Sequence, residues 1–236
     1  MNLVDYKINA SLYASLYSKL EITGTQFLAF RDLSKLISNY VEGIDTLDYG
    51  SGAGKSTLYL KTLGLNVNGV DINKDMIKIA KTNDSEGKYR LIESAKIPDE
   101  NNKYDLVFSS WVMMEVSSKQ ELLNIAKEIT RVLKNDGIFI MIVCNENTYN
   151  NDWLSENTQF VENKNLYSGA TVRILFKDIN LSIYDYFWSD EDYQEIMSNS
   201  GLQILEKYCP LGKDTDGYNW INEKIISPIT IYVMKK

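Results

Sequence analysis

Residues 44 to 57 read Ile-Asp-Thr-Leu-Asp-Tyr-Gly-Ser-Gly-Ala-Gly-Lys-Ser-Thr. A short apolar run with β-branched residues, typical of a strand, leads into three alternating glycines, Gly50, Gly52 and Gly54. Residues 56–63 then carry apolar side chains at helical spacing. Glycines permit positive φ angles and a close approach of ligand to backbone. The free N–H groups of the following helix favour a polar or anionic ligand. The stretch therefore predicts a strand, a tight turn and a helix that together hold a ligand.

The spacing of the glycines separates three nucleotide-binding motifs. A dinucleotide fingerprint requires a third glycine where this chain has Lys55, and a phosphate-binding P-loop requires a glycine where it has Tyr49. The spacing Asp48-x-Gly50-x-Gly52-x-Gly54 instead resembles motif I of the class I S-adenosylmethionine (SAM) dependent methyltransferases.

Length and composition predict one ordinary globular domain. The chain has 236 residues, of which 44% are hydrophobic and 24% are charged. Residues 1–7 lack the pattern of a signal peptide, and no apolar run is as long as a membrane span, so we expect a cytoplasmic protein with no membrane partner. The chain is expected to be a monomer or a homodimer.

Cysteine, histidine and charge exclude several classes of function. Cys144 and Cys209 are too few for a disulfide framework and are expected to be free thiols. The absence of histidine excludes a zinc site of the usual Cys/His kind and any mechanism with a histidine base, and we predict no metal site. The net charge of −7 argues against a nucleic-acid partner and favours a small neutral or cationic substrate.

Acidic residues follow two further predicted strands. Asp71 ends a strand about twenty residues beyond the glycines, where doubly wound sheets place an acid that binds ribose hydroxyls. Residues 93–98, Glu-Ser-Ala-Lys-Ile-Pro, resemble a recurrent stretch of small-molecule methyltransferases. That resemblance implies that the Glu93 side chain and the Ser94 backbone N–H bind adenine, with Glu in place of the commoner Asp.

Residues 104–116 resemble the fourth motif of the family, which lies beside the reactive methyl group. Family members often carry histidine near positions 114 and 115, where this chain has Met114 and Glu115, so a histidine-dependent mechanism does not carry over. Glu115 is the first candidate for a base by position, ahead of Asp185 or a tyrosine. The alternative is that Glu115 is a solvated or ion-paired residue at a helix start.

The order of predicted elements, together with the resemblance, indicates an α/β fold. We expect a doubly wound, mostly parallel seven-stranded sheet with helices on both faces and the last strand antiparallel. A single domain would comprise a helical lid (1–40), a SAM-binding half (41–144), a substrate-side β-hairpin insertion (145–188) and a C-terminal helix with two strands (189–236). In the lid, Gly24 would separate two helices, whose aromatic residues either pack on the sheet or, as Tyr6, Tyr13 and Tyr17, cover the ligand.

The resemblance and the predicted strand ends assign the site residues. The cofactor set is Tyr13, Arg31, Asp48, Gly50, Ser51, Gly52, Asp71, Ile72, Met76, Glu93, Ser94 and Ser110. Within it, Asp48 would accept main-chain N–H bonds from the glycine turn, and Arg31 or Tyr13 would contact the amino-acid end of SAM. The substrate set, on predicted loops and the hairpin, is Tyr17, Trp111, Met114, Asn145, Trp153, Arg173, Tyr184 and Trp188. The alternative is that some of these aromatic residues form the core of the insertion, with Trp188 as its anchor, and that Arg173 forms a surface ion pair.

The function expected from these residues is SAM-dependent transfer of a methyl group to O or N of a small organic molecule, with S-adenosylhomocysteine (SAH) as product. Catalysis would rest mainly on proximity and orientation. Two alternatives remain open: a non-catalytic SAM-binding or partner-binding protein on the same fold, and a P-loop-like phosphotransferase.

Overall fold

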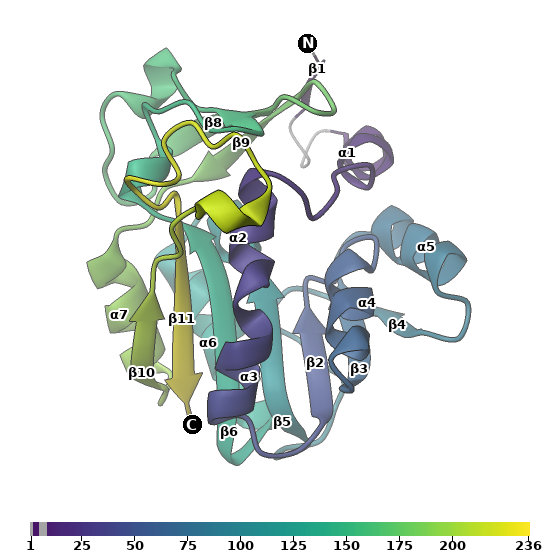
Figure 1. The fold of residues 1–236 in the computed structure, drawn as a ribbon. Helices are drawn as coiled ribbons and strands as arrows, with labels where there is room; N and C mark the ends of the chain where they lie inside the picture. The colour runs from purple at the N-terminus through teal and green to yellow at the C-terminus, as the bar shows by residue number, and fades with distance from the viewer. Residues whose placement is uncertain (1, 5–8) are drawn as a thin grey trace.

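A seven-stranded sheet forms the centre of the molecule (Figure 1), as a computed structural model of the chain describes it for residues 2–4 and 9–236. Its strands, in spatial order, are β10 (Gln203–Tyr208), β11 (Ile229–Lys235), β6 (Leu133–Cys144), β5 (Tyr104–Ser110), β2 (Asp45–Tyr49), β3 (Asn66–Asp71) and β4 (Lys88–Leu91). Strand β11 runs antiparallel to both of its neighbours, and the pairs from β6 to β4 are parallel. The predicted fold class is confirmed.

Helices bury both faces of this sheet, which explains the continuous apolar runs of its central strands. Phe108 and Ile140 face one way, and pack in a core with α2 (Thr25–Arg31), α3 (Leu33–Tyr40) and α4 (Lys55–Thr62). Val107 and Phe139 face the other way, toward α5 (Lys74–Asn83), α6 (Lys119–Val132) and α7 (Asp190–Asn199). Since successive side chains of a strand alternate in direction, each strand supplies both cores.

A second, four-stranded sheet lies over the carboxyl ends of the parallel strands (Figure 1). It consists of β1 (Asn2–Val4), β9 (Leu181–Tyr186), β8 (Thr171–Phe176) and β7 (Glu156–Asn157), in that order. The β8–β9 hairpin matches the predicted insertion. The parallel pairing of β1 with β9 was not predicted, because a three-residue strand shows no periodicity and its partner lies almost 180 residues away.

The N-terminal segment divides between two roles. Helix α1 (Ala10–Tyr17) contacts α5 at the edge of the sheet, whereas α2 and α3 pack on one face of it. The prediction of a lid over residues 1–40 is therefore too broad, since of the three helices described there α1 lines the cleft at the carboxyl ends of the parallel strands, whereas α2 and α3 do not. Gly24 does separate α1 from α2: it has a φ of +54°, and a Cβ there would lie 1.9 Å from Ser155 Oγ. Tyr6 lies outside the described residues.

Short 3-10 turns complete the chain. They are η1 (Met113–Glu115), η2 (Glu146–Thr148), η3 (Val161–Asn163) and η4 (Asp214–Asp216). Within the described ranges, no helix has both the length and the apolar character needed to cross a membrane.

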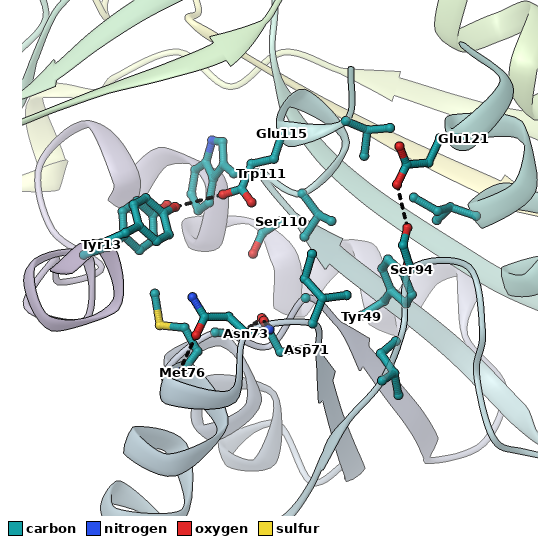
Figure 2. A pocket seen from close by; sticks show the side chains of 18 of the residues that line it. Tyr13, Tyr49, Asp71, Asn73, Met76, Ser94, Ser110, Trp111, Glu115 and Glu121 are labelled. Atoms are coloured by element: carbon teal, nitrogen blue, oxygen red, sulfur yellow. Dashed lines mark hydrogen bonds between the residues drawn. The ribbon is translucent and has the colours of Figure 1, made fainter. Parts of the chain in front are cut away.

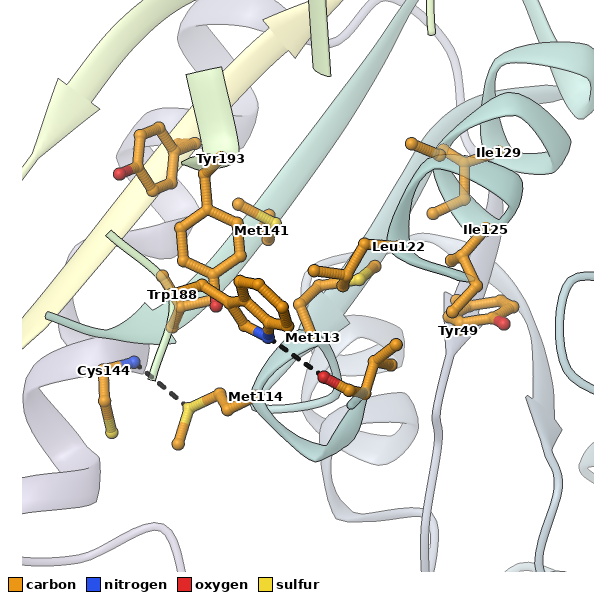
Figure 3. Close-up of a cluster of buried hydrophobic side chains, with 14 of the residues drawn as sticks. Tyr49, Met113, Met114, Leu122, Ile125, Ile129, Met141, Cys144, Trp188 and Tyr193 are labelled. Carbon is orange, nitrogen blue, oxygen red and sulfur yellow. Dashed lines mark hydrogen bonds between the residues drawn. The ribbon is translucent and has the colours of Figure 1, made fainter. Parts of the chain in front are cut away.

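Two tryptophans predicted to bind substrate are core residues instead. Trp188 packs with Tyr193, Met141 and Leu122 (Figure 3), and its Nε1 donates to the Val116 carbonyl oxygen at 3.0 Å. Trp188 thus anchors the end of β9 to the segment after η1, as the alternative interpretation holds. Trp153 is fully buried, and its Nε1 donates to the Thr148 carbonyl oxygen at 2.8 Å. Neither side chain lines the cleft at the carboxyl ends of the parallel strands, because both are buried in the packing of the insertion.

Candidate functional site

A cleft opens at the carboxyl ends of β2, β3 and β5 (Figure 2). The chain proceeds from β2 to β3 and β4 on one side, and then from β5 to β6 on the other, so the cleft lies at the topological switch point of the sheet. It encloses about 970 Å³, counted with the open solvent at its mouth. The predicted residues that line it are Tyr13, Tyr17, Gly50, Gly52, Asp71, Ile72, Met76, Ser94, Ser110, Trp111 and Glu115.

The glycine turn forms the floor of the cleft, and its glycines differ in what a Cβ at each position would contact. Gly50, Gly52 and Gly54 have φ angles of +79°, +49° and +90°. A Cβ on Gly50 would lie 2.0 Å from Val112 Cγ2, whereas a Cβ on Gly52 would meet nothing within 4 Å. Packing therefore requires Gly50, and Gly52 is the position at which a ligand can approach the main chain.

A second hollow lies on the other side of the glycine turn. Ser51 lines it and is buried, and its hydroxyl has no hydrogen-bond partner in the described part of the chain. Lys55, which a P-loop would aim at a phosphate, lines the same hollow and pairs with Glu21 Oε1 at 2.6 Å. The lysine is thus engaged by the segment that follows α1.

Asp71 ties the end of β3 to the glycine turn. Its Oδ2 accepts the Gly52 N–H at 2.8 Å, and its Oδ1 accepts the Asn73 N–H at 2.7 Å (Figure 2). Burial raises the pKa of Asp71, and these main-chain bonds oppose that shift. Each carboxylate oxygen keeps a further acceptor site for a ligand hydroxyl. The position therefore suits ribose, as the sequence predicts.

Asp48 is structural, which corrects the role predicted for it. It is fully buried, does not line the cleft, and its Oδ2 accepts the hydroxyls of Ser56 at 2.7 Å and Thr57 at 2.6 Å. It thus holds the first turn of α4 through side chains rather than main-chain N–H groups. Burial raises the pKa of Asp48 to about 6, and the two hydroxyl bonds oppose the shift.

In the region predicted to bind adenine, the acid that lines the cleft is Glu121 and not the predicted Glu93. The Glu93 side chain is 76% exposed and pairs with Lys96 at 2.5 Å, so it lies outside the cleft. Ser94 does line the cleft, and its Oγ donates to Glu121 Oε1 at 2.8 Å (Figure 2). Glu121 was not predicted, because it lies in the first turn of α6, three residues after the cap Ser118, where a glutamate ordinarily stabilises a helix start.

Other cleft residues that the sequence analysis missed carry weaker signals still. They are Tyr49, Asn73, Ile92, Val112, Val116, Ser117 and Ile125. Asn73 also caps α5, since its Oδ1 accepts the Asp75 N–H at 2.9 Å. Because capping alone explains an asparagine at this position, the sequence gives no sign that Asn73 also lines the cleft.

Helix α1 closes the cleft through two tyrosines. The Tyr13 hydroxyl donates to Glu115 Oε1 at 2.8 Å, and the rings of Tyr13 and Tyr17 stack with their centroids 5.0 Å apart. Burial raises the pKa of both tyrosines, so both hydroxyls remain protonated donors. Trp111, with a φ of +58°, forms part of the rim and packs against Phe30.

Arg31 and Asn145, which were also predicted as site residues, lie away from the cleft. Arg31 pairs with Asp32 at 2.7 Å and Asp216 at 2.8 Å, which fixes the C-terminal loop beside α2. Asn145 caps η2, and its Nδ2 donates to the Ser227 carbonyl oxygen at 3.1 Å. These contacts join segments distant in sequence, so they could not be predicted from spacing.

Arg173 and Tyr184 face away from the cleft on the hairpin. Arg173 lies 3.7 Å from the carboxylate of Glu162 and stacks over the Phe160 ring, and the Tyr184 hydroxyl lies 3.5 Å from Glu162 Oε1. Arg173 thus forms an ion pair, as the alternative holds, but its side chain is only 14% exposed and does not lie free at the surface. Met114 is buried against Cys144, whose N–H points to its Sδ at 3.2 Å, and it lines a smaller chamber beside the cleft rather than the cleft itself.

Comparison with known proteins connects this geometry to a family. Residues 47–141, from β2 to β6, match the methyltransferase-domain family. A ribosomal protein L11 methyltransferase of Dictyoglomus turgidum is 36% identical over 112 residues, which are 45% of this chain and 35% of that protein. A demethylmenaquinone methyltransferase of Bacillus pumilus is 27% identical over 78% of this chain and 77% of its own length.

A solved SAM-dependent methyltransferase structure from Clostridium acetobutylicum shares the fold. It superimposes with a TM-score of 0.63 and 18% identity, over 98% of each chain. The chain spans only about a third of the two L11 methyltransferases that it matches. Residues 47–141 are thus similar to the methyltransferase-domain family, and the sheet order with its glycine turn is the fold of the solved SAM-dependent methyltransferase.

Proposed function

We propose that the protein binds SAM in the cleft and transfers its methyl group to O or N of a small organic molecule. The observation that carries the proposal is the bond from the Gly52 N–H to the Asp71 carboxylate at the switch point, inside the segment that matches the methyltransferase domain. The residues present fit the cofactor. Gly52 leaves space above the main chain, Asp71 offers acceptors for ribose, and Ile72 and Met76 offer apolar surface for adenine.

SAM supplies a methyl group on a positively charged sulfur, and its transfer leaves the electron pair of the broken bond on sulfur in SAH. The protein then has to orient the acceptor and exclude water. Tyr13 and Tyr17 cover the cleft on the side of α1. Glu115 lines the cleft beneath them, where a carboxylate can accept a proton from an acceptor hydroxyl or amine.

Two other functions fit the site less well. A phosphotransferase would need Lys55 on a phosphate, and the lysine is paired with Glu21. A SAM-binding protein without turnover would keep Asp71 and the glycines and differ only in having no acceptor. The relatives are named for ribosomal protein L11 and for demethylmenaquinone, and a cleft covered on one side by Tyr13 and Tyr17 favours the small molecule.

Titration calorimetry with SAM, SAH, MgATP and NAD tests the cofactor. We expect binding of SAM and SAH only. Asp71→Ala removes hydrogen bonds to a charged group worth about 1.5–3 kcal/mol, so the affinity for SAM should fall roughly ten- to a hundredfold. Glu100→Ala, which removes one exposed negative charge elsewhere, is the control and should leave the affinity unchanged. Binding of MgATP alone would return Lys55 to a phosphate and refute the proposal.

The role of Glu115 is tested separately, once an acceptor is known. Glu115→Gln keeps a partner for the Tyr13 hydroxyl but cannot take a proton. If Glu115 is the base, the variant should lose the rise of kcat with pH that the wild-type protein shows. A pH profile identical to that of the wild type would assign Glu115 to positioning Tyr13.

A further inference from the structure

A small chamber adjoins the cleft under the four-stranded sheet, and shares Tyr17, Trp111 and Glu115 with it. It encloses about 290 Å³ counted with the open space at its mouth, and its interior has room for about one group the size of a water molecule or an ammonium. Its other walls come from β7, β8, β9 and the end of β6. A molecule that enters from the cleft would therefore place one end group in this chamber.

Three carboxyl groups face the chamber. Asp185 stands on β9 in alternation with the buried Leu181 and Ile183, at a position where the strand pattern requires an apolar side chain. It is 3% exposed, and its Oδ1 has no hydrogen-bond partner in the described part of the chain. Glu156 on β7 is 4% exposed and accepts a hydrogen bond from Gln26, and Glu115 forms the wall shared with the cleft.

No lysine or arginine of the described residues lines the chamber. Its aromatic walls are Tyr17, Trp111 and Phe176, and the Tyr17 and Phe176 rings meet edge to face with centroids 5.6 Å apart. Aromatic faces and carboxylates both attract a cation and repel an anion. A buried acid that lacks a partner is costly, and a bound cation with N–H donors would relieve that cost.

We propose that this chamber is the acceptor end of the site and that it selects a cationic amine, held by Asp185, whose nitrogen is the methylated atom. The inference rests on the proposed function and narrows its acceptor from O or N to an amine. The ammonium first gives one proton to a chamber carboxylate. The freed lone pair forms the N–C bond as the S–C bond breaks, and the electron pair of that bond remains on sulfur.

The protonation state of the chamber carboxyl groups provides a second measurable effect of amine binding. Burial raises the pKa of Asp185 well above its ordinary value, and raises that of Glu156 to about 7. Among the residues that the structure describes, the other titratable groups that influence or face these two acids are Tyr13, Tyr17, Glu115, Cys144, Tyr149, Lys177, Asp178, Tyr193 and Glu223. A bound ammonium favours the ionised carboxylate, so amine binding near neutral pH should release a proton. Calorimetry in buffers of different ionisation enthalpy measures that release.

The test uses protein saturated with SAH and three probes with one skeleton: phenethylamine, 2-phenylethanol and 3-phenylpropionate. The titration with SAH comes first, because failure to bind SAH would refute the proposed function itself. In the loaded protein we expect the amine to bind most tightly and the acid most weakly. Asp185→Asn should weaken amine binding about ten- to a hundredfold, and should leave the alcohol and SAH unaffected.

A charge control outside the chamber and a second chamber variant complete the test. Glu162→Gln removes the same charge from the outer side of the hairpin, beside Arg173, and should not change amine binding. Glu156→Gln removes a second chamber charge if Asp185→Asn does not fold. Equal affinity for the three probes, tighter binding of the alcohol or the acid, no detectable amine binding, or an unchanged amine affinity in the chamber variants would each overturn the inference.

Discussion

Asp48 should make the protein less stable at neutral pH than at mildly acidic pH, and Asp48→Asn should remove that loss. The side chain is fully buried, and only one of its oxygens has hydrogen-bond partners. Burial raises its pKa from the ordinary value of 3.8 to about 6. A shift of roughly two units corresponds to about 3 kcal/mol, at about 1.36 kcal/mol per unit.

The sign follows from proton linkage. Because the folded-state pKa lies above the unfolded one, the native protein binds more protons between about pH 4 and pH 6. The contribution of Asp48 to the free energy of unfolding therefore falls through that window, and the full loss is present above it. The asparagine variant does not titrate, so its stability relative to the wild type should rise by about 3 kcal/mol from pH 4 to pH 8.

Urea unfolding of the ligand-free protein at several pH values measures this difference. Asparagine keeps a carbonyl oxygen for the Ser56 and Thr57 hydroxyls, and any offset that does not depend on pH cancels in the comparison. Asp45→Asn in the same strand is the control. The pKa of Asp45 is lowered by its bonds to Asn66 and Lys134, so its variant should instead lose stability relative to the wild type as pH rises. Parallel curves for Asp48→Asn and the wild type would refute the reasoning.

Two further predictions concern packing around the site. Gly50→Ala should lower the melting temperature of the ligand-free protein because its Cβ would meet Val112 at 2.0 Å. Gly52→Ala has open space around its Cβ, so it should lose less stability but bind SAM more weakly. Equal losses of melting temperature in the two variants would contradict this assignment. Trp188→Phe leaves the buried Val116 carbonyl oxygen without its donor and should cost about 1–3 kcal/mol, or roughly 2–12 °C in melting temperature, measured by thermal unfolding.

Local patterns were enough to predict the elements that hold the cofactor. The glycine turn and Asp71 are encoded by short-range features, namely a β-branched run, positive-φ glycines and an acid at a strand end. The capped helix at Ser189 and the β8–β9 hairpin follow from equally local signals. These features depend on neighbouring residues, so the sequence specifies them without knowledge of the fold.

Side chains whose partners are distant in sequence could not be assigned this way. In the sequence Arg31 resembles a ligand-binding cation, but in the structure it pairs with Asp216. Trp153 likewise resembles an aromatic residue at the rim of a pocket, but the insertion buries it completely. Glu93 follows the family spacing, and yet its side chain turns to Lys96. Spacing gives no information on which of several polar groups the fold brings together.

The sequence alone determined the doubly wound sheet with a glycine turn and an acid at its switch point, because strand and helix periods and turn residues are local properties and because their order resembles a known family. Only the tertiary structure decided which face of the hairpin looks inward, and so placed Asp185 in the chamber with Glu115 and Glu156 rather than in solvent. That outcome depends on long-range packing of the small sheet over the large one, which buries whatever side chains the register of β9 turns inward.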